Sequence, residues 1–160
     1  MFSIHWLKRI CSRWDVMADN ISPEDRHKTM KAVKGRCTKP ERCLFSMLAG
    51  MRLKNWRKNA DDMVGKPDVV FSQEHIAIFI DGCFWHGCPH CDRKLPQTNR
   101  EYWERKIHRN IELAKQYNRK LKKAGWKVLR IWEHEIRNPA ERKRVREKIR
   151  QAIKQAAENQ

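Results

Sequence analysis

The sequence contains no run of 18 or more apolar residues, which excludes a membrane-spanning helix. It also lacks a secretion signal, because the apolar start at residues 1–7 is short and is followed at once by Lys8 and Arg9. Neither an internal repeat nor a domain-splitting linker is found, and a length of 160 residues suits one domain. We therefore expect a single soluble domain inside the cell.

Acidic residues are also few. The chain has 19 Asp and Glu against 36 Lys and Arg, a net charge of +17, while a 40% hydrophobic content with seven Trp excludes a wholly disordered basic tail. Such a charge indicates a polyanionic partner, because neutralising phosphates releases condensed counterions. Nucleic acid is the interpretation that this charge favours. A merely basic soluble protein and a binder of anionic membranes are the alternatives.

Hydrophobic periodicity and helix-start signals predict an α/β fold. Helices begin at the cap and early acids of residues 22–25, and at capping-box spacings over residues 38–41 and 98–101. The apolar run 75–80 reads as a central strand buried on both faces. The other expected elements are a strand over 67–71, joined to this one by a hairpin-like turn, a loop over 81–98, a strand over 126–132 and a charged helix from Pro139. This order predicts one domain with a mixed central sheet flanked by helices.

Six cysteines are present, and Cys83, Cys88 and Cys91 lie within nine positions. Without an export signal, this clustering indicates metal binding rather than disulfides. Thiolates and imidazoles are the ligands of tetrahedral zinc, and Cys-x2-Cys is a usual knuckle spacing, so His134 at the end of the last strand is a candidate fourth ligand. The spacing also matches plant-type iron–sulfur proteins, but these need a fourth cysteine and none follows Cys91.

Two acidic residues flank the predicted strand pair. Asp68 opens the first strand and Asp81 ends the second, an arrangement in which metal-dependent nucleases hold Mg²⁺ where a scissile phosphate binds. The main-chain carbonyl of Ile80 is a further candidate oxygen ligand. Because an Asp next to Pro67 is also typical of a turn, this pattern alone is a weak signal.

Several motifs follow one another in a fixed order. They are Glu41 at a helix start, Gly65-Lys66-Pro67-Asp68, Asp81-Gly82-Cys83-Phe84-Trp85-His86, Tyr102-Trp103-Glu104-Arg105-Lys106 with Asn110, and Gly125-Trp126 with Ile131-Trp132-Glu133. Together they closely resemble the very-short-patch-repair (Vsr) DNA mismatch endonucleases, from about Asp25 to about Ile136. The resemblance implies a restriction-endonuclease-like fold with a structural zinc. It also implies an enzyme that nicks one strand of duplex DNA at thymine–guanine mismatches left by deamination of 5-methylcytosine.

The resemblance implies a role for each matching residue. Asp68 is similar to the family's Mg²⁺ carboxylate, with the Ile80 main-chain carbonyl as a second ligand, His86 to its catalytic histidine and Glu41 to its helix-borne catalytic acid. Asp81 stands where some members carry a histidine, which adds a carboxylate to the metal site and removes a base. The aromatic residues that match the family's wedge beside the mismatch, and that we expect to bind DNA, are Phe84, Trp85 and Trp103.

The zinc ligands are assigned in the same way. Cys83, Cys88 and Cys91 correspond to family positions, and His134 stands where other members carry a cysteine. The loop length also allows His90 in place of Cys91, and we prefer Cys91 because it completes the knuckle.

Each assignment has an alternative in ordinary structure. Glu41 is suited to close a capping box, and His86, between two zinc ligands, is suited to be a ligand itself. Phe84 and Trp85 are suited to form a small core over the zinc. Trp103 begins an apolar helical stripe, whose usual place is against the sheet.

We therefore expect a monomeric, Mg²⁺-dependent and zinc-stabilised endonuclease that acts on mismatched double-stranded DNA. The resemblance implies action at the nucleoid in a bacterial cytoplasm, with general mismatch-repair proteins as partners. Residues 1–21 are expected to be a poorly ordered extension, residues 22–138 the endonuclease domain and residues 139–160 a basic helix. The rival functions are a non-catalytic zinc module that binds nucleic acid and a restriction or homing nuclease that cuts matched DNA.

Overall fold

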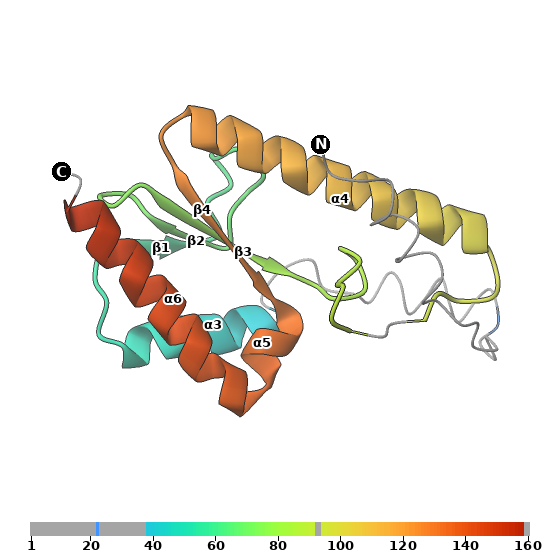
Figure 1. The fold of residues 1–160 in the computed structure, drawn as a ribbon, viewed down its shortest axis with the longest axis horizontal. Helices are drawn as coiled ribbons and strands as arrows, with labels where there is room; N and C mark the ends of the chain where they lie inside the picture. Colours follow the sequence, from blue (N-terminus) through green and yellow to red (C-terminus); the bar gives the residue numbers. More distant parts are fainter. Residues whose placement is uncertain (1–21, 23–37, 92–93, 159–160) are drawn as a thin grey trace.

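The computed structural model describes residues 22, 38–91 and 94–158 (Figure 1). Within them a mixed four-stranded sheet lies between helices, which confirms the predicted fold class. The helix expected from Ser22 and the extension expected over residues 1–21 fall outside the described residues, apart from Ser22 itself. No helix in the described ranges is long and apolar enough to cross a membrane.

Helix α3, Lys39–Gly50, begins where the sequence predicts. The Thr38 side chain accepts a hydrogen bond from the Glu41 main-chain N–H, and Pro40 lies in the first turn, where its missing N–H costs nothing. Leu44 and Leu48, one helical turn apart, are fully buried. The predicted apolar face of this helix therefore packs into the core.

The sheet has the order β1-β2-β3-β4, with β1 and β2 antiparallel, β2 and β3 antiparallel, and β3 and β4 parallel. Central strand β3 is buried at every position except Ile80, which is half-buried, as its continuous apolar run predicts. Strand β1 was not expected, because it has three residues and two of them are exposed. The strand bounds are Trp56–Lys58 for β1, Val69–Phe71 for β2, Ile76–Asp81 for β3 and Lys127–Trp132 for β4.

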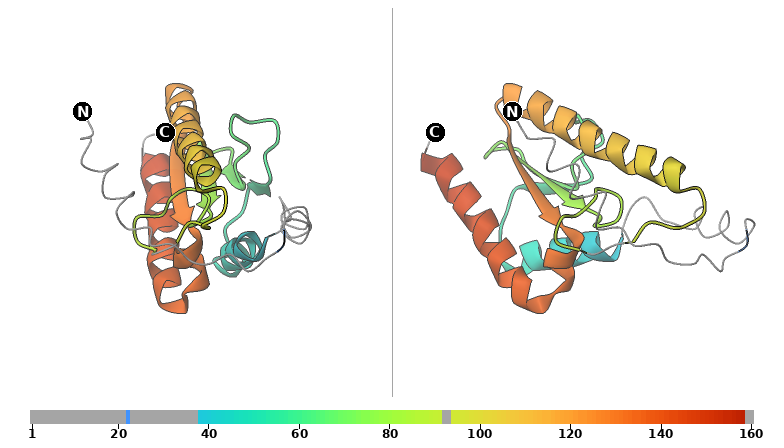
Figure 2. Two further views of the ribbon diagram at one scale, coloured as in Figure 1. Left: turned by 90° about the vertical axis from the view of Figure 1, so that its right-hand side faces the viewer. Right: turned by 45° about the vertical axis from the view of Figure 1, so that its right-hand side comes forward.

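Helices cover both faces of the sheet (Figures 1 and 2). On one face, α3, α5 (Glu133–Arg137) and α6 (Pro139–Glu158) enclose the main core. On the other, the long helix α4 (Arg100–Lys123) packs its C-terminal half on the sheet. The buried residues of the main core include Leu44, Leu48, Phe71, Ile76, Ile78, Ile131, Val145 and Ile149; those of the second face are Ala77, Phe79 and Leu121.

The start of α4 corrects one prediction. The capping box expected from Thr98 is not formed, because the N-cap is Asn99, in the left-handed region with φ 57°, and its side chain makes no cap hydrogen bond. Asparagine tolerates this region better than most residues, so the chain turns into the helix through the backbone of Asn99. The helix ends before Gly125, whose φ of 79° suits glycine, as expected.

The parallel pairing of β3 with β4 places two distant segments together. Both strands end at the same edge of the sheet, where Asp81 pairs with Trp132 in register. The loop after Asp81 carries the cysteine cluster, and the short helix α5 after Trp132 carries His134. This edge therefore gathers the residues that the motifs single out.

Candidate active site and metal centre

Asp68 and Ile80 lie next to each other at the edge where β2 begins and β3 ends. The main-chain N–H of Ile80 donates a hydrogen bond of 2.7 Å to Oδ2 of Asp68. In a strand, the N–H and C=O of one residue point to the same side. The Ile80 carbonyl therefore also faces the side on which Asp68 lies, and the two residues present oxygen atoms to a common space.

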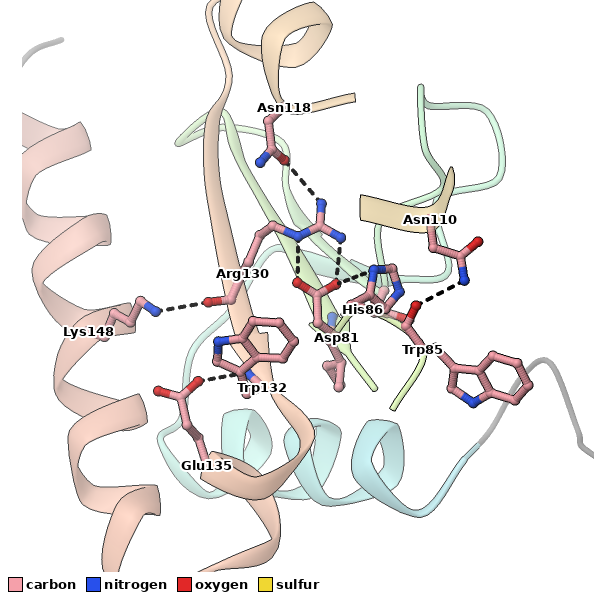
Figure 3. Close-up of polar contacts among 11 residues, drawn as sticks. Asp81, Trp85, His86, Asn110, Asn118, Arg130, Trp132, Glu135 and Lys148 are labelled. Carbon is pink, nitrogen blue, oxygen red and sulfur yellow. Dashed lines mark hydrogen bonds and ion pairs between the residues drawn. The ribbon is translucent and has the colours of Figure 1, made fainter. Parts of the chain in front are cut away.

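Asp81, the last residue of β3, is held by Arg130 of β4 (Figure 3). Nε of Arg130 donates to Oδ2 of Asp81 at 2.6 Å and Nη2 donates to Oδ1 at 2.5 Å, a bidentate pair. Asn118 of α4 accepts a third bond from Nη1 at 3.1 Å, and the guanidinium lies 4.6 Å from the ring centroid of Phe79. The Asp81 carboxylate is therefore committed to a cation of the protein itself.

His86 follows in the loop after β3, one turn beyond Gly82. Its main-chain N–H donates to the Gly82 carbonyl at 3.1 Å, which fixes the turn. Its Nδ1 atom is buried, has no hydrogen-bond partner among the described residues and lies 3.8 Å from Oδ1 of Asp81. Burial lowers the pKa of His86, with Asp81 opposing and Arg130 adding to that shift. This shift favours the neutral form of the imidazole.

These side chains line one cleft of about 280 Å³ between the sheet edge and α4. The pKa of Asp68 is raised to about 6, mainly by burial and in part by the negative charges of Glu41 and Asp81, while the hydrogen bond from Ile80 and the charge of Arg130 oppose the rise. Burial is therefore the main reason that Asp68 binds its proton more tightly than a free carboxyl group. Its lining residues are Gly65, Lys66, Asp68, Phe79, Ile80, Asp81, His86, Asn110, Leu113, Ala114, Tyr117 and Arg130.

Glu41 stands one step back from this cleft. It is not a lining residue, it is 6% exposed, and its Oε1 accepts a hydrogen bond of 2.7 Å from the Thr38 hydroxyl. Its main-chain N–H is capped by the same hydroxyl. The helix-start role that the sequence offered as an alternative is therefore present, and the carboxylate also adds its charge to the surroundings of Asp68.

Three cysteine sulfurs surround one nitrogen of His134. The Nδ1 atom lies 3.3 Å from Cys83 Sγ, 3.6 Å from Cys88 Sγ and 3.4 Å from Cys91 Sγ, and all four ligand atoms lie within 4.8 Å of one another. Zinc–sulfur bonds of about 2.3 Å and zinc–nitrogen bonds of about 2.0 Å at tetrahedral angles separate S and N by about 3.5 Å. The group therefore fits a tetrahedral zinc ion.

The surroundings of this group also suit a metal. Burial raises the pKa of the Cys83 thiol to about 12 and raises that of Cys88, so these sulfurs stay protonated unless a metal ion displaces the protons. The Cys83 main-chain N–H donates to Oε2 of Glu133 at 3.3 Å, which ties the loop to α5. The structure brings Cys91 into the group, whereas His90 is exposed and lies outside it.

The chain is similar in sequence to known DNA endonucleases. The model of the family described as DNA mismatch endonuclease Vsr matches residues 18–93. A type II nicking enzyme of Neisseria meningitidis serogroup C, V.NmeDIP, is 39% identical over 138 residues, which cover 85% of this chain and 90% of that protein. The chain belongs to the Vsr family.

Two further relatives carry the names of two kinds of endonuclease. The DNA mismatch endonuclease Vsr of Escherichia coli K12 is 38% identical over 122 residues, covering 76% of this chain and 77% of that protein. The type II nicking enzyme V.NaeI of Lentzea aerocolonigenes is 44% identical over 115 residues, covering 69% and 68%. This Vsr-family chain is accordingly an endonuclease.

The aromatic residues that the family resemblance singles out form one cluster beside the cleft. Ring centroids lie 5.3 Å apart for Phe84 and Trp85, 5.5 Å for Phe84 and Trp103, and 5.8 Å for Trp85 and Trp103. Phe84 and Trp85 are half-buried, whereas Trp103 is 6% exposed. The Trp103 side chain packs in a small cluster with Leu95 of the loop and not on the sheet. Tyr102, edge-on to Trp103, is half-exposed.

Arg130 and Asn118 were not predicted from the sequence. A signal for Arg130 was present, because an arginine inside the otherwise apolar run 128–132 needs an anionic partner when the strand is buried. Asn110, which the family motif includes, links two elements of the structure. Its Nδ2 donates to the Trp85 carbonyl at 3.0 Å and so ties α4 to the loop (Figure 3).

Proposed function

We propose that this Vsr-family endonuclease nicks one strand of duplex DNA at thymine–guanine mismatches that arise from deamination of 5-methylcytosine, and so starts very short patch repair. The observation that carries the proposal is that Asp68, Ile80, Asp81 and His86 line one cleft. The relative from Escherichia coli is named a DNA mismatch endonuclease and the others are named nicking enzymes, which supports a single-strand cut.

The residues suited to hold the catalytic Mg²⁺ are Asp68 and the Ile80 carbonyl. Both offer the oxygen ligands that a hard dication prefers. The pKa of Asp68 is raised mainly by burial and also by the charges of Glu41 and Asp81, and a bound dication would lower it. When bound, Mg²⁺ supplies charge stabilisation for the phosphorane-like transition state and acidifies a water. Glu41 does not line the cleft but adds its negative charge to the surroundings of Asp68. Asp81 pairs with Arg130 and is therefore better placed to orient His86 than to bind the metal.

His86 is the proton carrier of this proposal. A neutral imidazole in the cleft can accept a proton from a water that attacks the scissile phosphate. Other metal-dependent nucleases place a lysine two positions after the second metal ligand. Counted from Ile80, that position is Gly82 in this chain, so no lysine ammonium group is available there.

DNA binding is assigned to charge and to the aromatic cluster. The net charge of +17 predicts affinity that falls steeply with salt. Phe84 and Trp85 are half-buried beside the cleft and are suited to wedge between base pairs, which costs least at a mispair. Trp103 supports them from behind, and it takes part in the wedge only if the cluster opens.

The group of Cys83, Cys88, Cys91 and His134 is proposed to hold a structural zinc. All four protein ligands of a tetrahedral site are supplied, which is typical of structural rather than catalytic zinc. Since Cys83 and His86 share one short loop, the ion would fix the loop that carries the catalytic histidine.

The test is a nicking assay on an end-labelled duplex with one thymine–guanine pair, in Mg²⁺ and in EDTA. We expect a single nick that requires Mg²⁺. Binding without cleavage under any divalent metal would support the non-catalytic zinc module instead. Double-strand breaks in fully matched DNA would support the restriction or homing type of nuclease.

A further inference from the structure

Arg130 lies on the same face of the sheet as Asp81. Along β3, alternate residues share a face, so Asp81 points with Phe79 toward α4. The parallel register pairs Arg130 of β4 with Phe79, which places its side chain diagonally opposite Asp81. The guanidinium lies over the Phe79 ring. Its Nε and both terminal nitrogens donate hydrogen bonds to Asp81 and Asn118 (Figure 3).

Beyond its bidentate contact with Arg130, the Asp81 carboxylate has a further polar neighbour in this cleft, His86. Both of its oxygens accept from Arg130, and its Oδ1 faces Nδ1 of His86 at 3.8 Å. Nδ1 is buried and has no hydrogen-bond partner among the described residues, so it is a donor or acceptor still to be satisfied. A shift of about 1 Å would bring the two atoms to hydrogen-bond distance.

We propose that Arg130 is a positioning residue: it fixes Asp81 so that this carboxylate accepts a hydrogen bond from Nδ1–H of His86 and leaves Nε2 of His86 unprotonated toward the cleft. The hydrogen bond that one ring nitrogen makes decides which tautomer a histidine adopts. An unprotonated Nε2 is the form that accepts a proton from water. This inference rests on the proposed nuclease function for its kinetic consequence, but the tautomer itself does not depend on it.

A purely structural ion pair is the competing interpretation. Buried ion pairs are weak evidence for a contribution to stability, because desolvation offsets the attraction. The two interpretations separate in a double variant, Asp81→Asn with Arg130→Gln, which keeps side chains of similar size and removes both charges. If the pair is purely structural, the double variant keeps the parent tautomer of His86 and the parent nicking rate. If the pair positions His86, the double variant loses both.

The experiment uses the zinc-loaded full chain. Single-turnover nicking at saturating protein is measured with the thymine–guanine duplex, and the tautomer of His86 is read from its ¹⁵N chemical shifts at pH 8, assigned with a His86→Asn variant. The matched control is Arg57→Gln, since Arg57 makes the same bidentate contact, 2.7 Å to each oxygen of Asp62, on the surface and outside the cleft.

We expect the parent to show Nδ1–H at His86. Arg130→Gln and the double variant should lose that tautomer preference and slow single-turnover nicking at least tenfold, with duplex Kd changed less than threefold. Arg130→Lys, which cannot make the fork, should fall between Arg130→Gln and the parent, and Arg57→Gln should match the parent.

Three results would overturn the inference. They are an Nε2–H tautomer in the parent, a double variant that nicks at the parent rate, and an Arg130→Gln variant that loses duplex affinity while nicking normally at saturation, which would make Arg130 a phosphate contact. If the parent fails to nick mismatched DNA at all, the proposed function fails, and the tautomers of the parent and the variants still decide the positioning role.

Discussion

Asp68 and Ile80, side by side at the open end of the β2–β3 hairpin, are joined by a hydrogen bond of 2.7 Å from the Ile80 N–H to the Asp68 carboxylate. The contact exists because β2 and β3 are antiparallel, so the residue before β2 meets the end of β3. It orients one carboxylate oxygen and places a main-chain carbonyl on the same side. The two oxygen-bearing groups that we propose to hold Mg²⁺ therefore line the same cleft as His86.

Replacing Asp68 by Asn should abolish nicking. Metal coordination supplies several kcal/mol of transition-state stabilisation, and each ~1.4 kcal/mol is tenfold, so we expect a loss of at least about a thousandfold. Duplex affinity should stay equal or rise slightly, because an anion near phosphate is removed. Single-turnover nicking and a binding titration measure the two effects. The control is Asp62→Asn on the surface, which should nick normally.

The same substitution should raise the free energy of unfolding of the protein without bound Mg²⁺, and should raise it more at high pH. The pKa of Asp68 is raised to about 6, against about 3.9 in an unfolded chain, so ionisation costs folding free energy as pH rises from about 4 to about 6. Above that window the cost is constant at about 3 kcal/mol, and the Asp68→Asn variant avoids it. Thermal unfolding of both proteins in EDTA-free, Mg²⁺-free buffer at pH 5 and pH 8 measures the difference. A smaller gain at pH 8 than at pH 5 would contradict the raised pKa.

Loss of one cysteine of the metal group should release the ion. Cys83→Ser is expected to bind less than one zinc per chain and to lose several kcal/mol of folding free energy, because metal binding contributes directly to folding. Cys43→Ser is the matched control, since Cys43 lies outside the group, is half-buried against the main core, and its thiol makes a long hydrogen bond of 3.8 Å to the Ile136 carbonyl. Elemental analysis and thermal unfolding compare them. A well-folded, metal-free Cys83→Ser protein would show that the group is dispensable.

The aromatic cluster allows the wedge and the core to be separated. Trp103→Ala should cost about 3–5 kcal/mol of stability, because Trp103 is buried. Trp85→Ala should cost less, since Trp85 is half-buried, but should reduce the preference for mismatched over matched duplex about tenfold or more. Competition binding and denaturant unfolding supply both numbers. An unchanged mismatch preference in Trp85→Ala would remove this residue from the wedge.

Much of the fold could be predicted from local pattern. The cap at Thr38, the buried apolar run of β3 and the thin apolar line of α6 each specify an element through residues close in sequence. Helix α4 is different: its start depends on the left-handed backbone of Asn99, and a capping-box spacing one residue earlier misled the prediction. Strand β1 is too short and too exposed to give a period.

The site was predicted where chemistry restricts residue type and was missed where pairing decides. Sulfur and imidazole ligands indicate a metal by their spacing, and the four expected side chains do converge in the structure. The pair of Asp81 and Arg130, in contrast, depends on the register of two parallel strands that are neighbours in the sheet but are separated in the sequence by helix α4. No local pattern carries that register, so the sequence indicated Asp81 as a candidate metal ligand without indicating its partner Arg130.

The most direct test of the central claim is nick mapping at nucleotide resolution on duplexes that differ only in one base pair. Each strand is end-labelled, all mispairs and the matched duplex are compared, and parent and Asp68→Asn proteins are run with Mg²⁺. The account predicts one nick, in the strand that carries the thymine of the thymine–guanine pair, absent from matched DNA and from the variant. Equal cleavage of matched duplex, or cleavage by Asp68→Asn at the parent rate, would contradict it.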